Sequence, residues 1–546
     1  MTPQRPRRAR PGRAVLAAGS AVAVAIGGCA PLVTPQEATA PEQSVVEAPT
    51  RSGGELVVGL DAEPDALDPT LAGTLVGRQV FASMCEKLYD TGTDLSLVPQ
   101  LAADLPRLSD DGLVATVPLR TDAVFNDGTE FDAEAVKTSL DRHRELSGSS
   151  RGTELSAVRN VEVVDDHTVR IELSRPYAPL TSVLADRAGM IMSPEQLDEL
   201  GEDFGRHPVC VGPFSFVERV AQDRIVVEKS DLYYGADEVE LDRITYRAIT
   251  DDSIRLANLR SGQLDAALQI NPNDVATVST EDGLELLSQP STQYMGITVN
   301  IRNSDGVGEE PGQVEGELAR SDELREAFAL SLDRAMINEV VFSGLYAPAC
   351  GPIPPTSEYA TEETQACPDF DPDRARELVA ESGADTPVPV DMMIPNDPTN
   401  LRLGQVVQAM AAETGFRVRL RPTEFASSTA EGQAGNFETY VVGWSGRPDP
   451  DGNIAQFFTE GGSNNYSGYA TEETDRLIRE AAAENDPERR KELYSDLVPR
   501  LRGFNSIIYL YRQQIYVAHT DEVAGLQVYP DGLLRLGTAG YVAEGG

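Results

Sequence analysis

Phe125-Asn126-Asp127-Gly128-Thr129-Glu130-Phe131-Asp132-Ala133-Glu134-Ala135-Val136 is a stretch in which a tight turn leads into a helix. Residues 126–128 supply the left-handed backbone that such a turn requires, and Asp110-Asp111-Gly112 does the same upstream, so the segment between them can fold back as strands. Asp132 is a typical helix N-cap, and Glu134 lies in the first turn, where the helix dipole favours a carboxylate. The stretch therefore predicts paired strands followed by a helix.

Two further patterns predict strands. Residues 55–60 (Glu-Leu-Val-Val-Gly-Leu) form a short apolar run bounded by Gly-Gly and Asp61, and this run predicts a strand that opens the folded part. The β-prone runs 161–164 and 168–173 are separated by Asp165-Asp166-His167 and predict a hairpin.

Two other patterns predict helices. Ser321 is expected to open one long helix with an apolar face at i, i+4 spacing, and Asp371-Pro372 another that ends at Gly383. The apolar residues of the first are Leu324, Phe328, Leu332, Met336 and Val340. Strands and helices do not alternate strictly, so the chain is expected to be α/β or α+β, with several domains and no internal repeat.

Eight segments in one co-linear series resemble the family 5 extracellular solute-binding proteins, which are the peptide and nickel receptors of ABC importers. They are residues 97–102, 109–113, 125–136, 163–169, 211–214, 259–265, 329–334 and 507–511. The resemblance covers nearly all of the chain from about Gly54.

The resemblance implies an α/β, two-lobed periplasmic-binding-protein-like fold, with an extra inserted domain and a ligand cleft between the lobes. Lobe I is expected from residues 54–85, 197–291 and 512–546, the inserted domain II from 86–196, and lobe II (domain III) from 292–511. The chain would cross between the lobes near 292–300 and 509–512, and these strands would act as the hinge when the lobes close on ligand.

The first 28 residues have the pattern of a bacterial lipoprotein signal peptide. An Arg-rich start precedes the apolar run 14–26, which is shorter than the roughly 20 residues that span a bilayer. Gly27-Gly28-Cys29 resembles a lipobox, so Cys29 is expected to take a lipid; ordinary secretion with a free Cys29 thiol is the alternative. Residues 29–53, rich in Pro, Glu, Ala and Thr, are expected to be a disordered tether. These features predict an extracytoplasmic protein anchored to the cell membrane only by this lipid, in the periplasmic space or on the outer face of the plasma membrane.

The charge balance excludes some partners. The chain carries 88 Asp and Glu against 46 Lys and Arg, a formal net charge of −42. Nucleic acid and anionic lipid both need clustered positive charge, so neither is an expected partner.

Four cysteines besides Cys29 are expected to form disulfides in an oxidising compartment, and the sequence alone allows three pairings. Cys350 and Cys367 flank a Pro-rich loop that a disulfide would close, which leaves Cys85 for Cys210. A zinc site is the alternative, although no pair has the short Cys-x-x-Cys spacing of such sites.

The chain's single tryptophan, Trp444, lies in a Gly- and Pro-rich loop, residues 443–451. It resembles the cleft tryptophan of the family's oligopeptide receptors. In those relatives an Asp three residues after the Trp binds the peptide's α-ammonium group, whereas this chain has Arg447 there. An arginine favours a carboxylate instead. Asp449 or Asp451 could still bind an ammonium group, or Arg447 could pair with one of them and not contact ligand.

Other ligand-binding candidates follow from position in the same family. They are Ser445, Thr74, Tyr294, Asn464, Asn465 and Tyr509. Tyr, Asn and hydroxyl groups can pair with a peptide backbone, while roomy, wet pockets tolerate varied side chains. Residues 306–317 look like an insertion after the first crossing, with a disordered surface loop as the expected structure.

An enzyme is the competing class of function. Residues 148–152 match the Gly-x-Ser-x-Gly elbow of lipases and esterases, but the preceding stretch is polar and helix-like rather than a buried strand. The four histidines are scattered without metal-ligand spacing, so no metal, cofactor or catalytic residue is expected.

The sequence therefore predicts a substrate-binding lipoprotein of an ABC importer, acting as a monomer, that captures an oligopeptide or peptide-like solute for separate permease and ATPase subunits. An opine, a sugar or a metal chelate is the alternative ligand. A lipid-anchored hydrolase or an adhesin is the remaining possibility.

Overall fold

A computed structural model describes residues 44–543. The predicted signal peptide, Cys29 and residues 30–43 of the predicted tether lie outside the described residues. Within residues 44–543, no helix has both the length and the apolar character needed to cross a bilayer.

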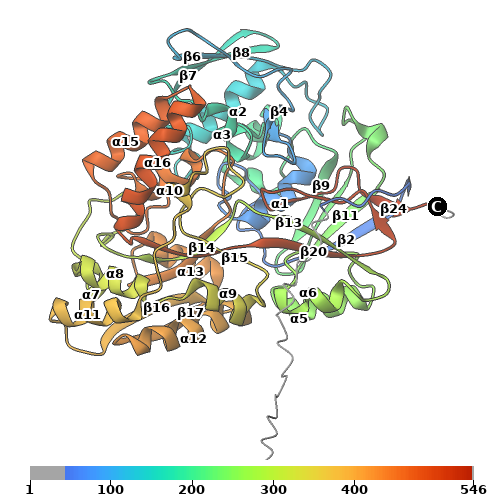
Figure 1. The fold of residues 1–546 in the computed structure, drawn as a ribbon. Helices are drawn as coiled ribbons and strands as arrows, with labels where there is room; N and C mark the ends of the chain where they lie inside the picture. Colours follow the sequence, from blue (N-terminus) through green and yellow to red (C-terminus); the bar gives the residue numbers. More distant parts are fainter. Residues whose placement is uncertain (1–43, 544–546) are drawn as a thin grey trace, which may run out of the picture. The chain divides into compact units, whose positions relative to one another are not determined.

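A seven-stranded mixed sheet is built from segments far apart in the sequence (Figure 1). Its order is β13 (Leu284–Pro290), β20 (Gln514–Thr520), β12 (Ala266–Ala267), β2 (Glu55–Leu60), β11 (Arg243–Ala248), β10 (Arg224–Lys229) and β9 (Phe214–Val220). The predicted strand β2 is central and pairs in parallel with β11 and β12. The helices beside this seven-stranded sheet are α1 (Leu75–Met84), α5 (Asp252–Arg260) and α6 (Pro272–Val278).

A four-stranded antiparallel sheet lies within the segment predicted to be inserted. Its order is β5 (Arg107–Leu108), β6 (Val114–Pro118), β8 (Thr168–Leu173) and β7 (Val158–Asp165). The predicted hairpin is confirmed as β7 and β8. Asp132 caps α2 (Ala133–Glu145) as predicted, because its carboxylate accepts from the Ala135 N–H at 2.8 Å, and α2 packs on this sheet (Figure 1). Shorter elements nearby are β3 (Tyr89–Thr91), β4 (Leu97–Pro99), α3 (Leu180–Val183), α4 (Pro194–Leu200) and the 3-10 turns η1 (Arg187–Gly189), η2 (Gly201–Arg206) and η3 (Ala236–Glu238).

A six-stranded sheet organises the region after residue 293. Its order is β15 (Ala347–Pro348), β19 (Ile507–Arg512), β14 (Tyr294–Val299), β18 (Thr439–Trp444), β16 (Val388–Pro395) and β17 (Phe416–Thr423). Around it are α7 (Glu317–Arg320), α8 (Asp322–Leu330), α9 (Arg334–Phe342), α10 (Glu362–Gln365), α11 (Pro372–Ser382), α12 (Pro398–Glu413), α13 (Phe425–Gln433), α14 (Asp451–Phe458), α15 (Glu472–Ala483) and α16 (Pro487–Gly503). The predicted division of the chain into two lobes and an inserted domain stays a prediction.

The chain passes between the seven- and six-stranded sheets at two adjacent places. The first is residues 291–293, between β13 and β14, and the second is Gln513, between β19 and β20. The two crossings are tied together, because the Ser291 hydroxyl donates to the Gln513 carbonyl at 2.6 Å. Two short adjacent connections of this kind can absorb a rotation of one part against the other.

The predicted long helix after Ser321 is two helices, α8 and α9. Ser321 does cap the first, but Asp333 caps a new helix by accepting from the Met336 N–H at 3.0 Å. The apolar i, i+4 pattern therefore holds only as far as Leu332, and Met336 and Val340 are about half exposed (52% and 51%). By contrast, α11 runs from Pro372 to Ser382 and ends at a left-handed Gly383, as predicted.

Two segments predicted to be disordered make backbone pairs. Residues 44–53 of the predicted tether dock on the C-terminal strands: β1 (Thr50–Arg51) pairs with β24 (Gly540–Val542), which also pairs with β21 (Val523–Ala524), and Val46 bonds Leu526. A further pair is β22 (Gln527–Val528) with β23 (Leu534–Arg535). The loop 306–317 is irregular, but its Val307 and Gly312 N–H groups donate to the carbonyls of Gln433 and Arg302. Composition missed these contacts because backbone pairing depends little on side-chain type.

Both predicted disulfides, Cys85–Cys210 and Cys350–Cys367, are confirmed. Cys85 directly follows α1, and Cys210 precedes β9, so the first disulfide joins the chain entering the predicted inserted domain to the chain that has left it. No cluster of metal-ligating side chains occurs within residues 44–543, and the zinc alternative finds no support there.

His143 on α2 should make stability depend on pH. Its ring is fully buried between the Thr70 hydroxyl and the Met190 carbonyl, and burial lowers the pKa of His143 to about 4. Between pH 6.5 and 4 the unfolded chain binds a proton that the folded chain does not, so acid destabilises the fold, by about 2 kcal/mol at pH 5. In denaturant melts, the stability advantage of the wild type over His143→Gln should therefore shrink by this amount between pH 7 and pH 5. It should stay constant from pH 7 to 8; an equally constant difference down to pH 5 would contradict the prediction.

Candidate functional site

Trp444 is the last residue of β18, directly opposite Tyr294 on β14. Its indole N–H donates to the Asn453 side chain at 2.9 Å, and its ring meets the Phe457 ring edge-on at 5.1 Å. Tyr294 also packs edge-on against Tyr509 of β19, with ring centroids 4.9 Å apart. The structure therefore brings three of the predicted ligand-binding residues into one aromatic cluster beside the first chain crossing, where both tyrosines are buried.

The loop after Trp444 turns sharply at Gly446. This glycine has a φ of 76°, and a Cβ there would lie 2.4 Å from the Thr292 carbonyl oxygen, so the turn excludes other residues. The turn places the Arg447 guanidinium over the Trp444 ring, 4.3 Å from its centroid. Arg447 also donates to the Gly446 carbonyl at 2.7 Å and to the Ser445 hydroxyl at 3.1 Å. Trp444, Ser445 and Arg447 thus form one unit.

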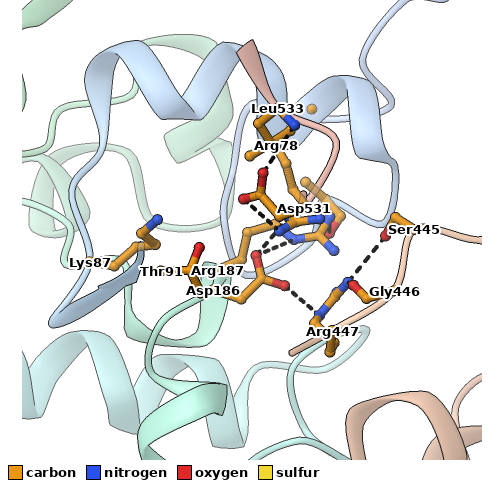
Figure 2. A network of polar contacts seen from close by, with 12 residues as sticks. Arg78, Lys87, Thr91, Asp186, Arg187, Ser445, Gly446, Arg447, Asp531 and Leu533 are labelled. Atoms are coloured by element: carbon orange, nitrogen blue, oxygen red, sulfur yellow. Dashed lines mark hydrogen bonds and ion pairs between the residues drawn. The ribbon is translucent and has the colours of Figure 1, made fainter. Parts of the chain in front are cut away.

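The alternative prediction, that Arg447 pairs with Asp449 or Asp451, is wrong, because Arg447 has a different partner. Its Nε lies 2.7 Å from a carboxylate oxygen of Asp186, in the predicted inserted domain (Figure 2). Asp449 instead accepts two hydrogen bonds from Arg490 of α16, at 2.5 and 2.7 Å.

Asp451 has a different partner. Its carboxylate accepts from the Tyr177 hydroxyl at 3.0 Å, and burial together with the charge of Asp449 raises the pKa of Asp451 to about 6. Both aspartates in this loop are therefore engaged within the protein, and neither presents a free carboxylate to an ammonium group.

The other predicted residues divide into two groups. Thr74 caps α1, and its carbonyl accepts from Arg187 at 3.1 Å. It therefore lies near Asp186, at the junction where the loop that carries Arg447 meets the predicted inserted domain. Asn464 and Asn465 follow α14 and hold their own loop: Asn464 donates to Gln456, and Asn465 donates to the carbonyls of Thr459 and Tyr469. Both asparagines have bonds that explain them without a ligand.

Several charged residues at this junction were missed by sequence reasoning. They are Arg78, Arg151, Glu154, Asp186, Arg187 and Asp531. Arg78 lies in the apolar helix α1, and the pair Asp186-Arg187 interrupts the apolar stretch 183–192. Charged residues inside apolar segments are seldom buried without partners, and this was the signal that could have found them.

Asp186 is the electrostatic centre of the junction. Burial alone would raise the pKa of Asp186, but the charges of Arg447, Arg78 and Arg187 outweigh it and hold the pKa well below its ordinary value. Burial also lowers the pKa of Arg447, to about 10, so this side chain stays charged at neutral pH. The junction therefore holds a permanent carboxylate surrounded by guanidinium groups.

The junction is packed shut in this structure. A shallow hollow of about 420 Å³ lies elsewhere, between residues 45–50 and the 525–538 region, and none of the predicted site residues lines it. The Gly-x-Ser-x-Gly match at 148–152 follows the helix α2 rather than a strand, and its Ser150 hydroxyl donates to the Leu71 carbonyl at 2.9 Å. It therefore lacks the context of a nucleophile elbow.

Known proteins resemble this chain over most of its length. The glutathione-binding protein GsiB of Salmonella paratyphi A is 28% identical over 500 residues, 89% of this chain and 94% of that protein. Two solved structures share the fold: AgaA from A. tumefaciens R10 in complex with agropinic acid (24% identity, TM-score 0.81, 90% of this chain and 99% of the other) and DppA from Helicobacter pylori in complex with the peptide STSA (21%, 0.80, 90% and 99%).

The family described as bacterial extracellular solute-binding proteins, family 5, matches residues 96–465. Its members are solute-binding receptors that work outside the cytoplasm, and the related structures are two-lobed periplasmic binding proteins of mixed α/β content. With the three sheets, the double crossing and the Trp444 loop described above, this chain belongs to the family 5 extracellular solute-binding proteins and has the receptor role of an ABC importer.

Proposed function

We propose that this receptor captures a peptide or peptide-like solute and delivers it to the permease of an ABC importer, without catalysing a reaction. The observation that carries the proposal is the Trp444–Arg447 unit, which comes from the six-stranded sheet and meets Asp186 of the inserted segment. An aromatic face beside a fixed guanidinium suits a small solute with an apolar body and a carboxylate. The glutathione-binding relatives support the same class, since glutathione is a tripeptide.

Capture by closure of the lobes follows from the positions of these groups. Arg447 and Asp186 lie in different parts of the chain, and both are nearly inaccessible to solvent in this packed arrangement. Solute can reach them only after these parts separate, and the two crossings at 291–293 and 513 are the places where such a rotation is possible. The solute would then favour closure by contacting both sides.

The N-terminal region completes the proposal. Cys29, with the Gly-Gly before it, would carry the lipid that anchors the receptor at the outer surface of the membrane. Residues 30–43 would form the tether, which is shorter than the sequence suggested because residues 44–53 dock on the folded body. The receptor would act as a monomer with separate permease and ATPase subunits as its partners.

Trp444 gives a direct test of peptide capture. Because it is the chain's single tryptophan, a titration of ligand-stripped protein with glutathione and with a mixed tripeptide library should change its fluorescence saturably. Calorimetry on the Trp444→Phe variant provides the control, since this variant should still bind but without the fluorescence signal. If neither method detects binding to the folded wild type, the peptide class is wrong, and opines, sugars and metal chelates become the candidates to titrate.

A further inference from the structure

Four buried arginines from three parts of the chain meet around Asp186, and Figure 2 labels three of them, Arg78, Arg187 and Arg447. Arg78 comes from α1, which packs against β9; Arg151 and Arg187 come from the inserted segment; and Arg447 comes from the loop after β18. Their side chains are only 1 to 6% exposed. Such a concentration of buried positive charge is costly unless something compensates for it.

Each of these arginines has one buried N–H group that makes no hydrogen bond among residues 44–543, although Nε of Arg187 lies 3.9 Å from Asp186 and Nη2 of Arg447 lies 4.0 Å from Glu154. The four groups are Nη1 of Arg78, Nε of Arg151, Nε of Arg187 and Nη2 of Arg447. Other hydrogen bonds hold these arginines in place. Nη1 of Arg151 donates to both carboxylate oxygens of Glu154, each at 3.0 Å, and Arg151 and Arg187 donate to the Ala72 carbonyl at 3.1 and 2.9 Å. The guanidinium groups are thus held in place with hydrogen-bonding capacity left over.

The nearby carboxylates do not use up this capacity. Asp186 and Glu154 are surrounded by the arginines, and the third carboxylate, Asp531, lies 3.7 Å from Arg78 but also pairs with Arg535 at 2.9 Å. Positive charges therefore outnumber negative ones at the junction. Since a buried unpaired donor costs free energy, a set of four in one cluster calls for an acceptor.

Arg255 shows that burial alone does not produce such free donors. It is as deeply buried as the four cluster arginines, at 2% exposure. Its Nε, Nη1 and Nη2 donate to the carbonyls of Leu268, Ile249 and Gln269, at 2.8, 2.5 and 2.8 Å. Nε of Arg175 and Nη1 of Arg535 also make no hydrogen bond within residues 44–543, so what distinguishes the cluster is that four such donors occur together around Asp186.

We propose that the four-arginine cluster, Arg78, Arg151, Arg187 and Arg447, is a subsite for a carboxylate of the captured solute. The inference rests on the proposed function and adds the chemical class of the group that is recognised. A carboxylate presents two oxygens with several lone pairs, which match guanidinium donors converging from different sides. Asp186 holds the guanidinium groups around this position. A bound carboxylate would join Arg447 to Arg151 and Arg187 and so favour closure.

The wild-type protein provides the first test, with two sets of probes. Calorimetry should show that glutathione binds at least tenfold more tightly than its derivative with both carboxylates converted to amides. In thermal melts at constant ionic strength, acetate should raise the Tm relative to chloride. Stabilisation by inorganic phosphate but not by acetate would overturn the assignment to a carboxylate and assign the subsite to a phosphoryl group.

Substitutions then show which residues produce the preference for the acid over the amide. Arg447→Gln and Arg187→Met should each reduce the preference for the acid over the amide at least tenfold. Arg255→Met is the matched control, because it removes an equally buried arginine outside the cluster and should leave the preference unchanged. An unchanged preference in both cluster variants would overturn the proposal, even if one of them folds poorly, because the other still reports.

The outcomes also separate this inference from the proposed function. Peptides that bind equally as acids and amides, with no response to acetate, would leave peptide capture standing and refute the carboxylate subsite. A rise in Tm with acetate that is lost in Arg447→Gln, in a protein that binds no peptide, would support the subsite and refute peptide capture.

Discussion

Replacing Arg490 with methionine should lower the free energy of unfolding by about 3–5 kcal/mol, the typical cost of removing one partner from a buried ion pair. The guanidinium of Arg490 forms a two-pronged pair with Asp449, and it also donates to the Ala481 carbonyl at 2.9 Å and to the Tyr494 hydroxyl at 3.0 Å. Without Arg490, the Asp449 carboxylate is left buried without its partner. The measurement is a urea or guanidinium melt followed by circular dichroism.

The neighbouring residue is a matched control. Arg489 is on the same helix, but it pairs with Glu492 in solvent, where the two side chains are 57% and 68% exposed. An exposed pair contributes at most about 1 kcal/mol, so Arg489→Met should have little effect. Equal losses in the two variants would show that the Asp449–Arg490 pair has no special role.

A second substitution tests the reason for the loss. Adding Asp449→Asn to Arg490→Met removes the stranded negative charge, so the double variant should be more stable than Arg490→Met alone. The same pair anchors the loop that carries Arg447. Arg490→Met should therefore also weaken binding of a carboxylate-bearing peptide, whereas Arg489→Met should not.

Loss of the Cys85–Cys210 disulfide should be the other large effect. The two cysteines are 125 residues apart in sequence, and constraining a loop of this length in the unfolded chain stabilises the fold by about 5 kcal/mol in the chain-entropy account. Replacing both cysteines with alanine should remove that amount. The loss should fall on the inserted segment, because the disulfide joins the two connections at its base. The Glu86 N–H bond to the Val211 carbonyl, at 2.8 Å, would remain as a weaker tie.

The second disulfide is the internal comparison for this prediction. Cys350 and Cys367 are 17 residues apart, so their replacement by alanine should cost only about 3 kcal/mol. Melts followed by Trp444 fluorescence report on the six-stranded sheet, whereas circular dichroism reports on the whole chain. In the Cys85→Ala/Cys210→Ala variant, the circular dichroism transition should begin at a lower denaturant concentration than the fluorescence transition. A larger loss from the shorter loop would refute the entropic explanation.

Local patterns predicted the elements whose physics is local. Asp132 and Asp371 cap helices, and residues 55–60 form a strand, because side-chain capping and alternation are determined within a few residues. The prediction of one long helix after Ser321 was wrong at Asp333, where a second N-cap interrupts a continuous apolar pattern. The prediction that residues 44–53 are disordered was wrong because their partners, the strands near 525 and 541, are distant in sequence.

The candidate site was predicted only in part. Trp444 and its loop were found through the family resemblance, and the structure places Trp444 opposite Tyr294. The partner of Arg447 was not found, because Asp186 is 261 positions away and no local pattern connects the two. Arg78 and Arg187 were overlooked although each lies inside an apolar segment, and no such pattern marks Arg151.

The sequence by itself determined the family and the positions of most of the helix caps and strands that it predicted. These depend on residue types at short spacing and on a co-linear series of motifs. The structure decided which of the three possible cysteine pairings occurs. Only the tertiary structure decided which charges meet at the junction of the three sheets. Burial makes each charge depend on all of its neighbours at once, and those neighbours come from segments that the sequence keeps hundreds of residues apart.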